Sequence, residues 1–243
     1  PLGYLSSAVC KNTNWSVQTY NSDFNPNEKK FSPENEYMTG KGFQRYLSTL
    51  KDPSLPIWNE VKKAIQEFNP NVLGITLKTQ NFTSSTIVAK LAKEINPDIK
   101  VVIGGAHATM NGDSVFKHKE IDVSCIGEGE VTIVELLKAF ENGTPLNAVN
   151  GIMFRDENNK IIKTPPRAYI EDLDSLTHPF TYASKTLKDF DKYPKDAFSN
   201  VFASRGCPYA CTFCESKAMW TRKVRYRSPE NIVAELKLMR EFG

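Results

Sequence analysis

The sequence contains no apolar run that approaches the roughly 20 residues needed to cross a membrane as a helix, so we expect no membrane span. It also lacks an excess of either charge, because 31 Lys and Arg stand against 28 Asp and Glu and leave a formal net charge of +3. The richest basic cluster, residues 222–227, is short, whereas nucleic-acid-binding domains usually carry a dense basic face. We therefore expect no nucleic acid as a partner.

Histidine and cysteine are both scarce. The three histidines are His107, His118 and His178, and the five cysteines are Cys10, Cys125, Cys207, Cys211 and Cys214. An odd number of cysteines, three of them within residues 207–214, does not indicate a disulfide framework. It indicates a metal site in a reducing compartment, and we therefore expect a cytoplasmic protein.

The composition is otherwise that of an ordinary globular protein, with 40% apolar and 24% charged residues. Within it, helical and strand patterns alternate from residue 55 to residue 140. Helices are predicted at 57–68, 83–95 and 131–140, and strands at 71–77, 100–105 and 121–126. This alternation predicts an α/β fold with a Rossmann-like, doubly wound parallel sheet. The nearly continuous apolar run at 71–77 is typical of a strand buried on both faces.

The N-terminal part is less regular. A helix is predicted at 2–9 and a strand at 15–20. No strand precedes that helix in the sequence, although a doubly wound domain normally opens with one. Residues 21–54 are polar and rich in Asn, Lys, Pro and Ser, and we expect an excursion there with at most one short helix near 43–50.

The pattern changes after residue 143. Short apolar runs at 150–154 and 160–164 flank a polar turn and predict a β-hairpin. A loop-rich connector follows, then a strand at 199–204, a loop with three cysteines, and a helix that starts at Ser228-Pro229. We therefore predict three parts, namely a sheet domain (1–145), a linker with the hairpin (146–195) and the beginning of a further domain (196–243).

The strongest motif is Cys207-Pro208-Tyr209-Ala210-Cys211-Thr212-Phe213-Cys214, a C-x3-C-x2-C spacing. Soft thiolate ligands favour iron–sulfur clusters, zinc or copper(I). Structural zinc normally has a fourth Cys or His ligand, and none is nearby in the sequence. Three thiolates suit a [4Fe–4S] cluster whose remaining iron is open to a substrate or cofactor, and a zinc knuckle is the alternative.

This loop, which follows a strand ending at Ser204-Arg205-Gly206 and precedes a helix, resembles the radical SAM superfamily. The resemblance implies that Cys207, Cys211 and Cys214 hold the cluster, and that the open iron binds S-adenosyl-L-methionine beside Phe213. It also implies reductive cleavage of that cofactor to a 5′-deoxyadenosyl radical. A complete barrel needs about 200 residues, so we expect this chain to be a truncated piece that is inactive alone.

Two glycine-rich loops follow predicted strands, Gly104-Gly105-Ala106-His107 and Gly127-Glu128-Gly129-Glu130. Ligands of open α/β sheets bind where parallel strands end, and glycine lets the backbone approach them closely. Together with the cysteine loop downstream, these loops resemble the cobalamin-binding domain of radical SAM enzymes. The resemblance implies a set of cobalamin contacts, namely Thr76, Thr79, Gln80, Gly104, Gly105, His107, Gly127, Glu128 and Gly129.

Alternatives remain for several of these residues. No Asp-x-His occurs in the chain, and the resemblance implies base-off cobalamin without a histidine ligand, with a cobalt-ligating histidine before Pro1 as the alternative. His107 is alternatively a residue that packs its loop, while Glu128 and Glu130 alternatively stabilise the start of the following helix. Cys10 and Cys125 are interpreted as inert core thiols. A sheet domain that binds no cobalamin is a further alternative.

The resemblance to cobalamin-dependent radical SAM enzymes implies three cofactors: a [4Fe–4S] cluster, S-adenosylmethionine and cobalamin. It implies methyl transfer to an unactivated centre of a small-molecule substrate, with ferredoxin or flavodoxin as electron donor; ring formation and ring contraction occur in relatives. Two other functions stay open. One is a radical SAM enzyme without cobalamin, similar to methylthiotransferases, although those carry three more cysteines in the front domain. The other is a non-enzymatic cobalamin-binding module with a structural zinc loop.

Overall fold

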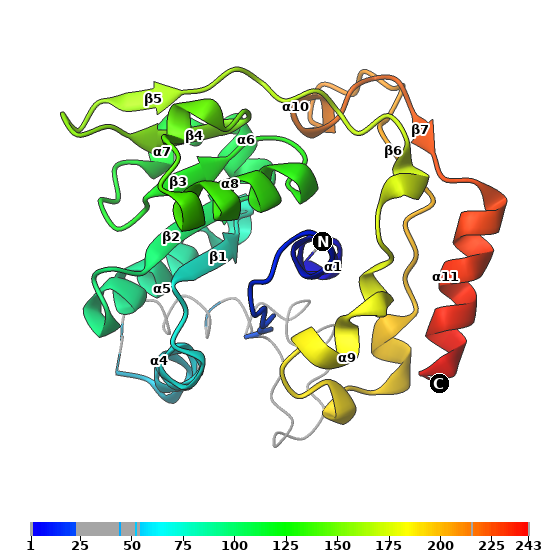
Figure 1. Cartoon of the computed structure of the whole chain (residues 1–243), viewed down its shortest axis with the longest axis horizontal. Coiled ribbons are helices and arrows are strands. Elements are labelled where there is room, and N and C mark those ends of the chain that lie inside the picture. The colour runs from blue at the N-terminus through cyan, green and yellow to red at the C-terminus, as the bar shows by residue number, and fades with distance from the viewer. Residues whose placement is uncertain (1, 23–43, 45–51, 53, 215, 243) are drawn as a thin grey trace.

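The structure is a computed structural model in which residues 2–22, 44, 52, 54–214 and 216–242 are described. Its centre is a sheet with the strand order β1-β2-β3-β4-β5 (Figure 1). The strands are Val72–Thr76, Lys100–Gly104, Val123–Cys125, Ile152–Arg155 and Ile161–Lys163. β1, β2 and β3 run parallel, whereas β4 and β5 are antiparallel to their neighbours. The predicted α/β fold with a Rossmann-like sheet is confirmed.

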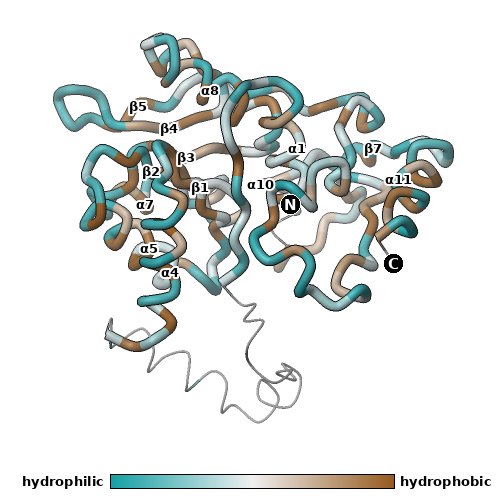
Figure 2. The backbone as a smooth tube through the Cα atoms, turned by 60° about the horizontal axis from the view of Figure 1, so that its bottom comes forward, coloured by the Kyte–Doolittle hydropathy of each residue, from teal (hydrophilic) through white to brown (hydrophobic). Residues whose placement is uncertain are grey.

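Helices pack on both faces of the sheet. They are α4 (Pro56–Phe68), α5 (Phe82–Ile95), α6 (Ala106–Met110), α7 (Gly112–Val115) and α8 (Glu130–Asn142). Val101 and Ile103 of β2 share one buried cluster with residues of α4 and α5, whereas Val102 shares the other with Leu136 of α8. β2 is therefore buried on both faces, as a doubly wound sheet requires. Figure 2 shows hydrophobic strands and a hydrophilic turn between β4 and β5.

The predicted β-hairpin forms, but it belongs to the main sheet. β4 pairs antiparallel with β3 through Ser124↔Met153, and β5 pairs with β4 through Phe154↔Ile162. Met153 is almost fully buried in the core next to α5 and α7. The hairpin assigned to the linker thus completes the sheet on the side of β3, and the sheet extends to Lys163.

Two N-terminal predictions differ from the structure. The strand predicted at 71–77 is β1, but Gly74 is exposed and its neighbours are half-buried, because β1 is the outer strand of the sheet in the described part of the chain. Residues 15–20 form no strand; Thr19 makes an isolated bridge to Leu187, and the pairing does not extend to the neighbouring residues. The excursion at 21–54 and its short helix fall almost wholly outside the described residues.

The C-terminal part lies beside the sheet, with α1 (Leu2–Asn12) between the two (Figure 1). α1 packs against α8 and against the connector turn Pro179–Thr181. After α9 (Ala183–Thr186) come β6 (Ser204–Arg205), α10 (Ser216–Met219), β7 (Arg225–Tyr226) and α11 (Pro229–Glu241). The strand predicted at 199–204 is wrong except at Ser204, because the strand is formed by Ser204–Arg205, and β7, which was not predicted, pairs antiparallel with it.

Helix α11 begins where it was predicted. The Ser228 side chain accepts a hydrogen bond from the Asn231 backbone N–H at 3.1 Å, and Pro229 occupies the first turn. Both features suit a helix N-terminus, since a cap satisfies a free N–H and proline has none to satisfy.

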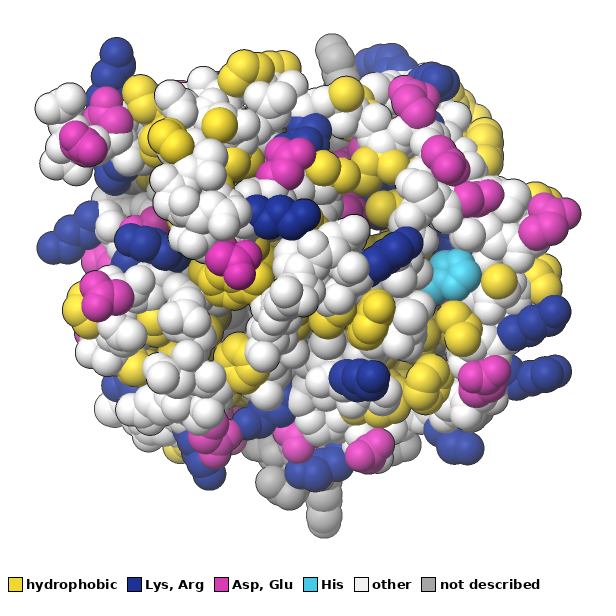
Figure 3. All heavy atoms as spheres, viewed as in Figure 1, with side chains coloured by type: hydrophobic (Ala, Val, Ile, Leu, Met, Phe, Trp, Pro, Cys, Tyr) yellow, Lys and Arg dark blue, Asp and Glu magenta, His cyan; other side chains and the backbone are white. Residues whose placement is uncertain are grey.

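Neither sign of charge dominates the face of the molecule seen in Figure 3, where basic and acidic side chains are interspersed. Among the helices that the structure describes, none combines the length and the apolar character of a membrane span.

Candidate functional site

The loops predicted to bind cofactor start from one edge of the sheet. The register places Thr76, the last residue of β1, opposite Gly104, the last residue of β2, and Gly104 opposite Cys125 at the end of β3. Because these three strands are parallel, the segments that follow them leave the sheet side by side. The structure therefore brings the predicted residues after β1, β2 and β3 to a common edge.

The segment after β1 is ordered by side-chain hydrogen bonds. Asn81 accepts a hydrogen bond from the Lys78 backbone N–H at 2.7 Å and donates one to the Thr76 carbonyl at 2.9 Å. Thr79 Oγ1 and His107 Nδ1 lie 3.1 Å apart, so the loops after β1 and β2 are joined directly. The His107 ring also packs on Phe82, with ring centroids 4.9 Å apart. These contacts fit the loop-packing alternative for His107, while its contact with cobalamin stays a prediction.

Gly105 cannot be replaced without strain. Its φ is +119°, and a Cβ at this position would lie 2.7 Å from the Leu77 carbonyl oxygen. Only glycine adopts such a backbone at low cost. The consequence is that α6 starts directly against the end of β1, with His107 N–H donating to the Leu77 carbonyl at 3.3 Å.

The segment after β3 is open on one side and packed on the other. Gly127 has a φ of +76° and nothing within 4 Å of an added Cβ, and its N–H donates to Thr109 Oγ1 at 3.0 Å. Gly129 lies against α1, since a Cβ there would be 2.9 Å from Leu5 Cδ2. The strand-end edge therefore offers backbone that a large cofactor could approach at Gly127, which fits the predicted cobalamin site.

Glu128 and Glu130 point away from solvent and toward the C-terminal part. Glu128 Oε1 accepts from Arg205 Nη1 at 2.8 Å, and its Oε2 accepts from Arg225 Nη1 at 2.8 Å and from the Ile170 backbone N–H at 2.7 Å. Glu130 Oε1 accepts from Arg205 Nη2 at 2.5 Å. The Glu128 carboxylate is fully engaged within the protein, and its predicted contact with cobalamin stays a prediction.

Opposing effects act on the pKa of Glu128. Burial by itself raises the pKa, but hydrogen bonds from Arg225, Arg205 and the Ile170 N–H outweigh burial and hold the pKa below its ordinary value. Glu128 is therefore ionised at neutral pH. Burial also raises the pKa of Cys125, to about 12, which agrees with its interpretation as an inert core thiol.

The cysteine loop lies at the surface. Cys211 and Cys214 are exposed, Cys207 is partly exposed, and Phe213 is 87% exposed. In the described part of the chain, no group of three or more His, Cys, Asp or Glu side chains is close enough to hold a metal ion. The donor set and spacing fit a three-thiolate cluster, with Cys207, Cys211 and Cys214 as the residues that would hold it, but the loop is not arranged around a common centre.

The two predicted cofactor regions are neighbours. Helix α10, which begins two residues after Cys214, packs against α6, which begins directly after Gly105. The structure therefore brings the cysteine loop close to the strand-end edge of the sheet, as the upper part of Figure 1 shows.

Sequence reasoning missed residues that organise this region. Asn81 and Thr109 order the two loops, and Arg205 and Arg225 bind Glu128. An available signal was the position of Arg205, two residues before Cys207, the first cysteine of the predicted cluster loop. Arg225 carried no comparable signal, because its partner is 97 residues away in the sequence.

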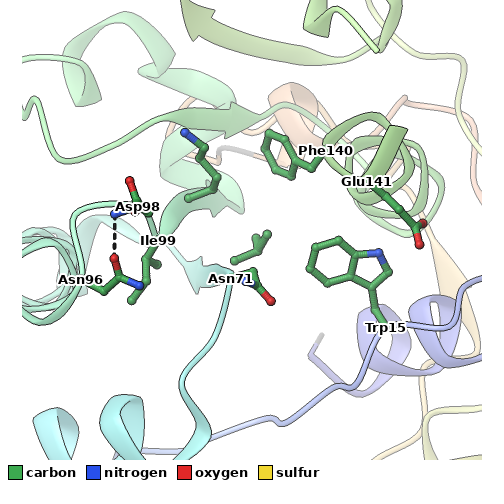
Figure 4. Close-up of a pocket in the computed structure, with 9 residues that line it drawn as sticks. Trp15, Asn71, Asn96, Asp98, Ile99, Phe140 and Glu141 are labelled. Carbon is green, nitrogen blue, oxygen red and sulfur yellow. Dashed lines mark hydrogen bonds between the residues drawn. The ribbon is translucent and has the colours of Figure 1, made fainter. Parts of the chain in front are cut away.

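A pocket of about 320 Å³ lies at the opposite end of the sheet, where β1 and β2 begin. Figure 4 shows Trp15 near Phe140 at one side of the pocket, and Asn96 with Asp98 at the other. Asn96 Oδ1 accepts a hydrogen bond from the Asp98 N–H at 2.9 Å, which orders the turn before β2. This pocket is separate from the strand-end edge and contains none of the predicted site residues.

Comparison with known proteins gives a family. Residues 37–137 match the model of the B12 binding domain. The chain is 35% identical over 190 residues to an uncharacterized methyltransferase of Pyrococcus horikoshii, covering 76% of this chain and 40% of that protein. It is 32% identical over 189 residues to the anaerobic magnesium-protoporphyrin IX monomethyl ester cyclase of Rubrivivax gelatinosus, covering 74% of this chain and 33% of that protein.

A third relative is the cobalamin-dependent radical SAM methyltransferase TokK of Streptomyces tokunonensis, 31% identical over 152 residues, covering 60% of this chain and 22% of that protein. Among solved structures, the cobalamin-dependent S-adenosylmethionine radical enzyme OxsB with aqua-cobalamin bound has the same fold. The TM-score is 0.58 at 19% identity, over 76% of this chain and 26% of OxsB. The chain thus spans two fifths or less of the length of these relatives. Residues 37–137 thus match the B12 binding domain, and the chain is similar in sequence to part of a cobalamin-dependent radical SAM methyltransferase.

Proposed function

We propose that this chain is the cofactor-assembling front part of a cobalamin-dependent radical SAM methyltransferase. The observation that carries the proposal is the packing of α10, next to the cysteine loop, against α6, next to the glycine loop at the sheet edge. Two cofactors held by these loops would lie on adjoining surfaces. A methyl group on cobalamin and a radical generated at the cluster both have to reach one substrate, and this arrangement suits that requirement.

The cofactors supply the reactive chemistry, with S-adenosylmethionine as radical source and cobalamin as methyl carrier. The residues of this chain bind and orient them. Gly127 gives backbone access at the sheet edge, Gly105 lets α6 start against the end of β1, and the Thr79–His107 contact keeps the two loops together. Cys207, Cys211 and Cys214 would bind the cluster, with Phe213 beside the adenine of S-adenosylmethionine. A small-molecule substrate and a ferredoxin or flavodoxin would be the partners, in the cytoplasm.

Two features support methyl transfer as the reaction. Two of the three relatives described above are named methyltransferases, and the identity extends over about three quarters of this chain for one of them. The third is named a cyclase, and ring formation is therefore the second candidate reaction for the same pair of cofactors. The two reactions differ in whether a methyl group is lost from S-adenosylmethionine in each cycle.

The test is an anaerobic reconstitution of the full-length gene product with iron, sulfide and hydroxocobalamin, followed by desalting and an absorption spectrum. The proposal expects retained corrinoid bands together with an iron–sulfur shoulder and, after reduction, formation of 5′-deoxyadenosine from S-adenosylmethionine. A cluster without corrinoid would leave a radical SAM enzyme that does not use cobalamin. Corrinoid with zinc and no sulfide would leave a cobalamin-binding module.

A further inference from the structure

The sheet domain and the cysteine-bearing part are joined at one buried carboxylate. The side chain of Glu128, in the loop after β3, is 2% exposed. One of its oxygens accepts from Arg205 on β6, and the other accepts from Arg225 on β7 and from the Ile170 backbone of the connector. β6, β7 and the connector, which all follow the sheet in the sequence, therefore contact one side chain. That side chain belongs to the loop after β3, at the edge of the sheet where cobalamin is proposed to bind.

Arg205 is held from several sides. Its guanidinium lies over the rings of Tyr4 and Trp220, with its Cζ 5.4 Å and 5.5 Å from their centroids. Its two terminal nitrogens bind Glu128 and Glu130, at 2.8 Å and 2.5 Å. An arginine that donates hydrogen bonds to two carboxylates and also lies against two aromatic rings has little freedom to move.

The position of Arg205 determines where the cysteine loop begins. Arg205 pairs with Arg225 in the β6–β7 ladder, and only Gly206 separates it from Cys207. Gly206 has a φ of +111°, and a Cβ there would lie 2.3 Å from the Lys223 carbonyl oxygen. The chain is therefore tightly packed between Arg205 and the first cluster cysteine, so a displacement of β6 would displace Cys207.

We propose that Glu128 is a positioning residue that, through Arg205 and Arg225, fixes the strand leading into the cysteine loop against the cofactor edge of the sheet. The inference rests on the proposed function, because it concerns the distance between two bound cofactors. It assigns Glu128 a role other than direct contact with cobalamin. The charges in the cluster balance, with Glu128 and Glu130 facing Arg205 and Arg225, so the cluster orients the two parts without needing an external ion.

The decisive variant is Glu128→Gln. A glutamine side chain has one acceptor oxygen, and its amide N–H groups would face Arg225 and the Ile170 N–H, which are themselves donors. The matched control is Glu235→Gln. Glu235 is equally buried and pairs with Arg227, and both residues belong to the C-terminal part. Arg227 also donates to the Tyr4 hydroxyl of α1 at 3.3 Å, whereas the hydrogen bonds described for the Glu128 carboxylate come from Arg205, Arg225 and Ile170. Glu128→Gln loses two buried ion pairs and Glu235→Gln loses one, and only the first loses the connection between the two parts.

The measurement is the dipolar distance between cob(II)alamin and the reduced cluster, obtained by pulsed electron paramagnetic resonance on the full-length protein. Glu128→Gln should broaden or shift the distance distribution while iron and corrinoid contents stay at wild-type levels, and Glu235→Gln should leave it unchanged. An unchanged distribution in Glu128→Gln overturns the inference, as does an equal broadening in Glu235→Gln. A wild-type protein without a spin pair would instead overturn the proposed function.

A second readout needs no cofactor. In cofactor-free protein, backbone amides of residues 204–207 and 225–227 should exchange with deuterium at least about tenfold faster in Glu128→Gln, as expected for the loss of a buried charged hydrogen bond. Exchange at wild-type rates in these segments would contradict the inference. If Glu128→Gln does not fold, Glu130→Gln removes only one of the two carboxylates on Arg205 and should give the same changes at smaller amplitude.

Discussion

The cobalamin-binding region and the cysteine region of this chain are built in different ways. Around the sheet edge, backbone and side chains are already ordered: Gly105 is locked against Leu77, and the Asn81 side chain closes its own turn. Around the cysteines, the strands are two residues long, and Cys211 and Cys214 face solvent. The first region has a hydrophobic core beneath it, whereas the second depends on contacts with its neighbours.

This difference shows where the geometry of each site comes from. A parallel sheet buried on both faces places the residues after its strands without help from a ligand. A loop that carries three thiolates gains its shape chiefly from the metal centre that it binds, since metal binding and local folding are coupled. The first region should therefore tolerate loss of its cofactor, and the second should not.

The largest expected effect comes from replacing the three cysteines that are proposed to bind the cluster. Changing Cys207, Cys211 and Cys214 together to Ala should abolish iron and sulfide binding in the full-length protein. It should leave corrinoid retention near the wild-type level, because these side chains lie outside the buried core. Iron and sulfide analysis with the corrinoid absorption bands checks both parts. Loss of corrinoid along with iron would show that the sheet edge is not preformed.

Thiol reactivity gives the second contrast. Burial raises the pKa of Cys125 to about 12, so at pH 8 only about one such thiol in ten thousand is ionised. In cofactor-free, reduced protein, iodoacetamide should therefore modify the exposed Cys211 and Cys214 while leaving Cys125 unmodified. Mass spectrometry of peptides over time measures the rates. Modification of Cys125 at a similar rate would mean that the core around β3 opens readily.

A glycine pair tests how rigid the sheet edge is. Gly105→Ala should lower the free energy of unfolding by roughly 1–3 kcal/mol and weaken corrinoid retention, because the new Cβ meets the Leu77 carbonyl at a positive φ. Gly74→Ala on the edge strand is the control. An added Cβ there meets nothing within 4 Å, and removing a strand glycine should stabilise the fold by about 0.5 kcal/mol. Chemical denaturation compares the two, and equal effects would contradict the assignment of strain to Gly105.

The two regions also differed in how well their sequence predicted them. Continuous apolar runs predicted β2 and β3, because a strand buried on both faces is apolar throughout. Apolar residues at helical spacing predicted α5 and α8, because each of these helices buries one face. The cysteine spacing predicted a metal-binding loop, because ligand number and separation are local properties. The prediction of a strand at 15–20 is wrong. A strand needs a partner strand to pair with, and the local sequence pattern does not show whether one is present.

What the sequence could not predict was the pairing between distant elements. The hairpin at 152–163 was expected in a linker, but its antiparallel pairing with β3 depends on tertiary contacts. Glu128 was interpreted as a cofactor contact because it lies in a glycine-rich loop, yet its partner Arg205 is 77 residues away. Ion pairs between residues this far apart leave no periodic pattern in the sequence. The charge of each residue and its position in a motif were therefore the only clues to the pairing.

The smallest expected effect separates surface charge from the buried cluster. Lys223 pairs with Glu171 at 2.7 Å, but both side chains are about two-thirds exposed. The hydrogen bond and charge of Lys223 lower the pKa of Glu171, so the stability from this pair is present above the ordinary glutamate pKa and is lost as pH falls through the lowered value. Because water and salt screen this pair, Lys223→Ala should leave the denaturation midpoint and the exchange of residues 204–207 unchanged at neutral pH. The pKa of Glu171, followed by nuclear magnetic resonance, should rise. The outcome that would contradict this is a change in the denaturation midpoint or in hydrogen exchange in Lys223→Ala as large as that in Glu128→Gln. The contact between the connector and the segment before β7, and not the buried Glu128 carboxylate, would then hold the cysteine loop in place.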